Sequence, residues 1–166
     1  MGENLRSVAI GRLVVSGDAD DVLVTYGIGS CVAICLYDPL LRVGGMLHAL
    51  IPTSPNGDLR SVKSPRFVDE GVVMLLEELG KWEVRPSRAM TYLCGGAQVL
   101  SLPNTNGAQT IGERNVQAAE AALRAAGLSI RGQLVGGTVG RTVKLYIATG
   151  DVTVRSLGHT EVLLDK

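Results

Sequence analysis

The side chains of this sequence best suited to nucleophilic or acid–base chemistry are three cysteines and two histidines. Cys31 directly follows the glycine-rich segment Gly27-Ile28-Gly29-Ser30, and His48 follows Gly44-Gly45-Met46-Leu47. A cysteine attacks an acyl carbon only as a thiolate, so an imidazole that removes its proton turns an inert thiol into a nucleophile. The pair therefore predicts covalent catalysis by Cys31 with His48 as the base.

Each of these residues also has a purely structural interpretation. A free cysteine beside the apolar residues 32–34 is more often a small buried hydrophobe, and Cys35 and Cys94 are interpreted in that way. Cys31 differs because a glycine-rich turn at the start of a strand lets the backbone approach a substrate. His48, between Leu47 and Ala49, stands where a histidine is often a satisfied core residue.

The chemistry argues for a base near Cys31. A free thiol with a pKa of about 8.5 is only slightly ionised at pH 7, so nucleophilic attack requires a base within hydrogen-bond reach. The second histidine, His159, lies in a polar C-terminal stretch, and we expect it at the surface.

The segment from Val24 through Asp38-Pro39 to His48 and Pro52 resembles the chemotaxis glutamine deamidase (CheD) family. The resemblance covers nearly the whole chain, because further matches follow in the family's order: Gly95-Gly96-Ala97, Ile111-Gly112 with Arg114-Asn115, Gly136-Gly137 with Arg141, and Thr149-Gly150. Any one of these motifs alone would be weak evidence. Their order makes the resemblance specific.

The resemblance implies a triad of Cys31 as nucleophile, His48 as base and Thr25 as the residue that orients the imidazole. From the residues alone, Thr25 is equally consistent with a strand threonine satisfied by the backbone. The implied reaction is hydrolysis of glutamine side chains on the cytoplasmic helices of methyl-accepting chemotaxis receptors, through a thioester that water releases as glutamate. Backbone N–H groups near Gly27, Gly29 and Ser30 are the expected oxyanion or substrate donors.

Two other functions stay open at this point. The chain could act chiefly as a binding partner and regulator of a CheC-type chemotaxis phosphatase, with vestigial catalysis, or it could be a cysteine peptidase or transglutaminase-like enzyme. Tyr92, Leu134-Val135 and Thr138 depart from common family residues. They do not touch the triad, so they bear on substrate preference and partner binding.

Composition excludes several other classes. Lysine plus arginine equal aspartate plus glutamate at 16 each, without the basic patch of a nucleic-acid binder. We expect no metal, because Cys31 and Cys35 lack the usual ligand spacing, and no other cofactor. No apolar run reaches the roughly 20 residues that span a bilayer, so we expect a cytoplasmic protein without membrane insertion. Along one strand Cys31 and Cys35 would lie about 13 Å apart, too far for a disulfide.

The predicted helices and strands that must position these residues indicate a single α+β domain that spans residues 1–166. Two helices are predicted, one capped by Ser64 and running to Gly80, the other from about Glu113 to Gly127. Short apolar pieces predict strands, and those at 31–37 and 46–51 are expected at the buried centre. The other predicted strands cover 8–10, 13–15, 22–24, 90–93, 130–135, 143–147 and 152–154.

The family resemblance implies two mixed β-sheets layered with outer helices, similar to the catalytic domain of the cytotoxic necrotizing factor toxins. Loops are expected at 52–63 and 101–109, where proline, asparagine and glycine cluster.

Overall fold

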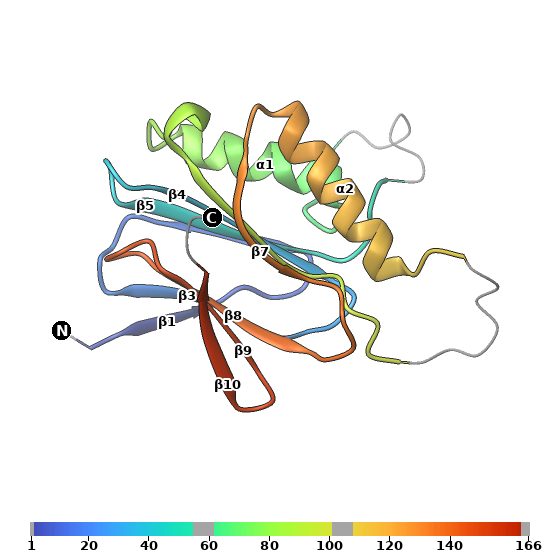
Figure 1. Ribbon diagram of the computed structural model, residues 1–166. Coiled ribbons are helices and arrows are strands. Elements are labelled where there is room, and N and C mark those ends of the chain that lie inside the picture. The colour runs from blue at the N-terminus through green and yellow to red at the C-terminus, as the bar shows by residue number, and fades with distance from the viewer. Residues whose placement is uncertain (1, 55–61, 101–107, 164–166) are drawn as a thin grey trace.

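The computed structural model describes residues 2–54, 62–100 and 108–163. Within these ranges the chain forms two five-stranded sheets and two α-helices, and both helices lie on the same side of one sheet (Figure 1). The predicted fold class, α+β with two mixed sheets and outer helices, is confirmed. Most of both predicted loops, 55–61 and 101–107, lies outside the described residues.

The first sheet has the strand order β1-β3-β8-β9-β10. Its β1 and β3 strands are parallel and its other pairs are antiparallel. The strands are β1 (Asn4–Ser7), β3 (Asp21–Ile28), β8 (Arg141–Tyr146), β9 (Val152–Ser156) and β10 (His159–Leu163). A register shift after Thr25 marks a bulge in β3, and Gly27 within it has φ 62°, a left-handed conformation that glycine adopts without strain.

The second sheet has the order β2-β5-β4-β6-β7, with only β6 and β7 parallel. Its strands are β2 (Arg12–Ser16), β5 (Val43–Ala49), β4 (Val32–Asp38), β6 (Met90–Gly95) and β7 (Ile130–Val135). Every residue of β4 and β5 is buried, which confirms the prediction for the two central strands. They are apolar on both faces because one face meets the first sheet and the other meets the helices.

The two helices, α1 (Val68–Gly80) and α2 (Ile111–Ala125), pack on the outer face of the second sheet. A short 3-10 helix, η2 (Pro86–Arg88), leads into β6. One apolar cluster fills the space between the two sheets and a second fills the space between the second sheet and the helices. The protein is thus a three-layer β–β–α arrangement (Figure 1).

The helix boundaries differ from prediction in their caps. Ser64 does not cap α1: the helix begins after Phe67, which makes no side-chain cap, and the N–H groups of Val68 and Asp69 instead donate to the carbonyls of Ile51 and Pro52. Main-chain acceptors of the segment just after β5 thus replace the capping side chain. α2 begins two residues before Glu113, because Thr110 and Glu113 form a capping box.

One predicted strand was wrong, and the two edge strands of the first sheet were not predicted. The predicted strand at 8–10 is the crossing between the sheets, and the true first strand, β1, is an exposed polar segment that pairs with β3. β10 was missed because it is polar and mostly exposed. It forms a hairpin with β9 through Leu157 and Gly158, both with positive φ, the conformation of a tight two-residue hairpin turn.

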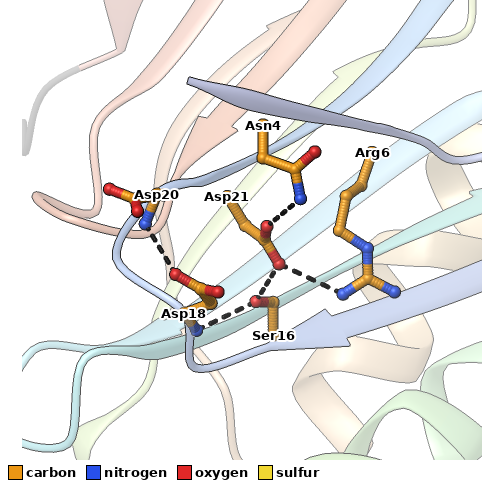
Figure 2. Close-up of polar contacts among 6 residues, drawn as sticks. All are labelled: Asn4, Arg6, Ser16, Asp18, Asp20 and Asp21. Carbon is orange, nitrogen blue, oxygen red and sulfur yellow. Dashed lines mark hydrogen bonds and ion pairs between the residues drawn. The ribbon is translucent and has the colours of Figure 1, made fainter. Parts of the chain in front are cut away.

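One polar cluster joins three strands at the start of β3 (Figure 2). The buried Asp21 carboxylate accepts hydrogen bonds from Ser16 and from Asn4 at 2.7 Å, and an ion pair from Arg6 at 3.1 Å. Burial alone would raise the pKa of Asp21, but these donors hold it below its ordinary value. The cluster therefore connects β1 and β2 to β3, because their side chains supply the hydrogen bonds that water would otherwise give the Asp21 carboxylate.

Candidate active site

Thr25 and His48, which the sequence analysis placed in one triad, meet in the layer between the two sheets. Thr25 lies on β3 of the first sheet, and its Oγ1 is 2.8 Å from the Nδ1 of His48 on β5 of the second sheet. Both residues are buried. The hydrogen bond thus crosses the apolar core and holds the imidazole between the sheets.

A second contact fixes the tautomer of His48. Its Nδ1 also lies 3.2 Å from the carbonyl oxygen of Val8, which can only accept a hydrogen bond. Nδ1 must therefore carry the hydrogen in the neutral ring, which leaves Nε2 as the acceptor. Nε2 is buried and has no hydrogen-bond partner among the described residues.

The environment of His48 keeps its ring neutral. Burial lowers the pKa of His48 below its ordinary value of 6.5, and the hydrogen bond to the Val8 carbonyl opposes that shift. A neutral ring with a free Nε2 lone pair has the protonation state that a general base requires.

Cys31 lies in the bend just before β4 and faces the same inter-sheet cluster as Ala33 and Cys35. Ala33 is the cross-strand partner of His48, so Cys31, two residues earlier on the same face, is a diagonal neighbour of His48. Diagonal neighbours in an antiparallel pair are about 7–8 Å apart, within reach of long side chains. The two side chains therefore share one face at the same end of β4 and β5.

The Cys31 thiol is mostly enclosed, with 8% of the residue exposed. Burial raises the pKa of Cys31 above its ordinary value, and its own backbone N–H partly offsets this. Cys31 therefore rests as a thiol, and attack requires a base to remove its proton. Cys35 and Cys94 are buried completely, and burial raises the pKa of Cys94 to about 12.

The backbone of the turn that precedes Cys31 is held by its carbonyl groups. The carbonyls of Gly29 and Cys31 accept hydrogen bonds from the N–H groups of Ala97 and Gly96, and the carbonyl of Ser30 accepts one from the Asn115 side chain. No backbone acceptor within the described ranges takes the N–H of Ser30 or of Cys31. These two N–H groups are thus available as donors beside the thiol.

Gly95 must be glycine for this turn to form. Its φ is 107°, and a Cβ atom there would overlap the carbonyl oxygen of Cys31. Together with Gly96 it supplies the close backbone approach behind the nucleophile candidate, which gives the Gly95-Gly96-Ala97 motif a physical reason.

Two residues of the site were only quoted as motif members in the sequence and received no role there. Asn115 is fully buried on α2. Arg141 is 7% exposed and donates to the carbonyls of Gly95 and Gly136 at 3.3 and 2.7 Å. The sequence signal that could have identified them is a polar residue at a position where the pattern expects an apolar one. Asn115 stands at helical spacing before Ala119 and Leu123, and Arg141 lies on the same strand face as Val143.

A pocket of about 430 Å3 opens beside the turn. Gly29 and Ser30 form one wall, and residues 97–100 and 109–112 form the rest. The lining includes Val99 and Ile111, both partly exposed, so the pocket offers an apolar wall next to the Cys31 turn.

His159 is exposed on β10 of the first sheet, as predicted, whereas His48 lies on β5 of the second sheet. All three cysteines are free. No helix in the described part of the chain is long and apolar enough to cross a membrane.

Comparisons with known proteins decide the family. The family model described as CheD chemotactic sensory transduction matches residues 50–156. A protein of Symbiobacterium thermophilum named "Probable chemoreceptor glutamine deamidase CheD" is 39% identical over 157 residues, which cover 95% of each chain. The chain belongs to the CheD family.

Other relatives agree. The "Probable chemoreceptor glutamine deamidase CheD 2" of Anaeromyxobacter dehalogenans is 40% identical over 154 residues, or 92% of this chain and 95% of the relative. Among solved structures, the hypothetical protein YfiH of Bacillus licheniformis superposes with a TM-score of 0.47 at 13% identity, over 77% of this CheD-family chain and 57% of YfiH.

Proposed function

We propose that this chain is a protein-glutamine deamidase that hydrolyses glutamine side chains of chemoreceptors to glutamate and releases ammonia. Its curated relatives carry that activity in their names. The single observation that supports it best is the state of His48: a neutral ring, anchored through Nδ1, whose buried Nε2 has no partner in the described part of the chain and lies on the same face as Cys31.

In the proposed mechanism, Nε2 of His48 accepts the Cys31 proton as Sγ attacks the glutamine carboxamide carbon. The carbonyl oxygen becomes an oxyanion, and the N–H groups of Ser30 and Cys31 donate to it, with Gly27 and Gly29 shaping the turn. Nε2–H then gives its proton to the departing nitrogen, which leaves as ammonia when the C–N bond breaks. A thioester to Cys31 remains.

The second half of the reaction uses the same groups. Nε2 of His48 removes a proton from water, the hydroxide oxygen attacks the thioester carbon, and the C–S bond breaks to release glutamate. The proton returns to Sγ, so the enzyme is restored. Thr25 has an orienting role, because its uncharged hydroxyl steers the ring and stabilises the imidazolium less than a carboxylate would.

The proposed substrates are the cytoplasmic helices of methyl-accepting chemotaxis receptors. The test is incubation of the purified chain with cytoplasmic receptor fragments, followed by peptide mapping for glutamine converted to glutamate. We expect conversion by the wild type and none by Cys31→Ala. Cys35→Ala is the matched control, since Cys35 shares the face of β4 but lies fully buried, and it should retain activity.

The same experiment separates the enzyme from the regulator of a CheC-type phosphatase with vestigial catalysis. That alternative requires no particular tautomer of His48 and no donors beside Cys31, so the arrangement favours the enzyme. Absence of conversion on every receptor fragment, with wild-type protein shown to be folded, would favour the regulator instead.

A further inference from the structure

Asn115 stands out because it is an amide on the core-facing stripe of α2. It is fully buried, and on the same stripe Ala119 and Leu123 pack against the second sheet. Asparagine is a weak helix former and carries four hydrogen-bonding capacities that burial must satisfy. Packing on the sheet alone would favour an apolar residue at this position.

The Asn115 side chain joins two strands at the end of their shared ladder. Its Nδ2 donates to the carbonyl of Ser30 at 2.8 Å and to the carbonyl of Leu50 at 3.0 Å. The last paired residues of β4 and β5 are Val32 and Ala49, so the next rung would place Cys31 opposite Leu50. The Asn115 amide therefore connects the two chain segments at the point where the backbone ladder between β4 and β5 ends.

The orientation of the amide follows from its neighbours. Both are carbonyl oxygens, which only accept, so the NH2 group must face them and both of its hydrogens are used. The Oδ1 atom is then left buried with no partner among the described residues. A buried acceptor without a partner is uncommon in proteins and calls for an explanation beyond packing.

We infer that Asn115 is a positioning residue that sets the distance and angle between the Cys31 thiol and the His48 imidazole. One hydrogen bond holds the residue before the nucleophile, and the other holds the residue two positions after the base. The inference rests on the proposed function, because the roles of Cys31 and His48 come from it.

A matched pair of truncations tests this role. Asn115→Ala removes both hydrogen bonds, whereas Leu123→Ala removes a buried side chain from the same face of the same helix, two turns away. Both variants are compared well below their unfolding midpoints, and rates are expressed per folded molecule. Leu123→Ala thus reports what loosening the helix alone does to the site.

For deamidation we expect Asn115→Ala to lower kcat by about tenfold or more with KM within about twofold, since small misplacements of reacting groups are costly. Leu123→Ala should stay within about twofold of wild type in both constants, as the groups near the thiol are intact. Equal kcat for the two variants would overturn the inference.

A second readout does not depend on any receptor substrate. The alkylation rate of Cys31 by iodoacetamide, followed by peptide mapping across pH, reports how well His48 assists the thiol. We expect Asn115→Ala to slow alkylation near pH 7 and to shift the profile to higher pH, and Leu123→Ala to leave it unchanged. An unchanged profile for Asn115→Ala would contradict the positioning role, whereas inactivity of the wild type on receptors would count against the proposed function only.

Discussion

Asp21 and His48 are both buried ionisable residues at the junction of the two sheets, yet their surroundings differ. The Asp21 carboxylate has Ser16, Asn4 and Arg6 as partners (Figure 2). Among the residues that the structure describes, His48 has partners on Nδ1 only, and its buried Nε2 has none. Both oxygens of the Asp21 carboxylate thus have partners, whereas one ring nitrogen of His48 has none among the described residues.

The difference separates a group that holds the fold from the group that we propose as the base. A buried polar atom without a partner costs about 1–3 kcal/mol, so selection for stability alone would remove it. In the described residues four side-chain atoms are in this state: the hydroxyl oxygens of Ser54 and Thr91, His48 Nε2 and Asn115 Oδ1. Of these, His48 Nε2 belongs to the proposed base, and Asn115 Oδ1 belongs to the residue that binds the carbonyl of Ser30 next to Cys31.

The largest expected effect comes from removing the unused acceptor. His48→Ala should lower deamidation by at least about a hundredfold, the usual scale for loss of a general base. The free energy of unfolding should change little, because the lost hydrogen bonds are offset by removal of the unpaired Nε2. Steady-state deamidation and urea unfolding measure the two quantities, and a folded His48→Ala protein with near-wild-type activity would contradict the mechanism.

Asp21→Asn should show the reverse pattern. The free energy of unfolding at pH 7 should fall by about 1–3 kcal/mol, because an amide NH2 would face the donors that now bind the carboxylate, while kcat per folded molecule stays at wild type. Arg6 is 44% exposed on its side chain and Asn4 is also exposed, so most of the loss should come from the buried Ser16. Asp20→Asn, an exposed neighbour, is the control.

The pH dependence of this loss has a defined direction. The folded-state pKa of Asp21 is lowered from its ordinary 3.8, so its stabilisation is present above pH 3.8 and is lost as the pH falls through the lowered folded pKa. Urea unfolding of wild type and Asp21→Asn should therefore converge in acid. A difference that persists unchanged there would show that packing, and not the charge, causes the loss.

Thr25→Val should have a smaller effect on catalysis than His48→Ala. The variant keeps the shape of the side chain and removes the hydroxyl, while the Val8 carbonyl still fixes the hydrogen on Nδ1. We expect kcat to fall by about tenfold or less, near 1.4 kcal/mol. Thr91→Val is the control, since Thr91 is also a buried strand threonine and its Oγ1 has no partner within the described ranges. A loss as large as that of His48→Ala would assign the hydroxyl a role beyond orientation.

Apolar patterning was enough to predict the centre of the fold. The continuous apolar runs of β4 and β5 and the helical stripe of α1 each reflect burial against neighbours, and burial leaves a periodic record in the sequence. The edge strand and the helix end left no such record in the sequence. β1 is an exposed polar strand stabilised by pairing with β3, and the carbonyl of Ile51 accepts a hydrogen bond from the N-terminus of α1. Main-chain partners carry no side-chain signature.

In the candidate site, too, some features could be predicted from the sequence and others could not. Residue type and spacing pointed to Cys31 and His48, the family resemblance added Thr25, and the structure brings Thr25 to His48. The carbonyl of Val8 could not be predicted, because any residue supplies a carbonyl. Asn115 left a signal, an amide in an apolar stripe, but its two acceptors are known only once β4, β5 and α2 are assembled.

The smallest expected effect is the pH dependence of catalysis by His48. Its pH range can be compared directly with that of the stability contributed by Asp21. Because the pKa of His48 is lowered below 6.5, more than half of the rings stay neutral at pH 6.5, so kcat should fall less than about twofold between pH 8 and pH 6.5. The same shift makes neutral His48 contribute stability above pH 6.5 that is lost as the pH falls below it, a window well above that of Asp21. Deamidation rates and urea unfolding over pH 5–8 measure both, with His48→Ala as the control whose stability should lack this step. An acid limb of kcat centred above pH 6.5 would mean that the ring is stabilised as the cation, and that its unpaired Nε2 is not the resting base.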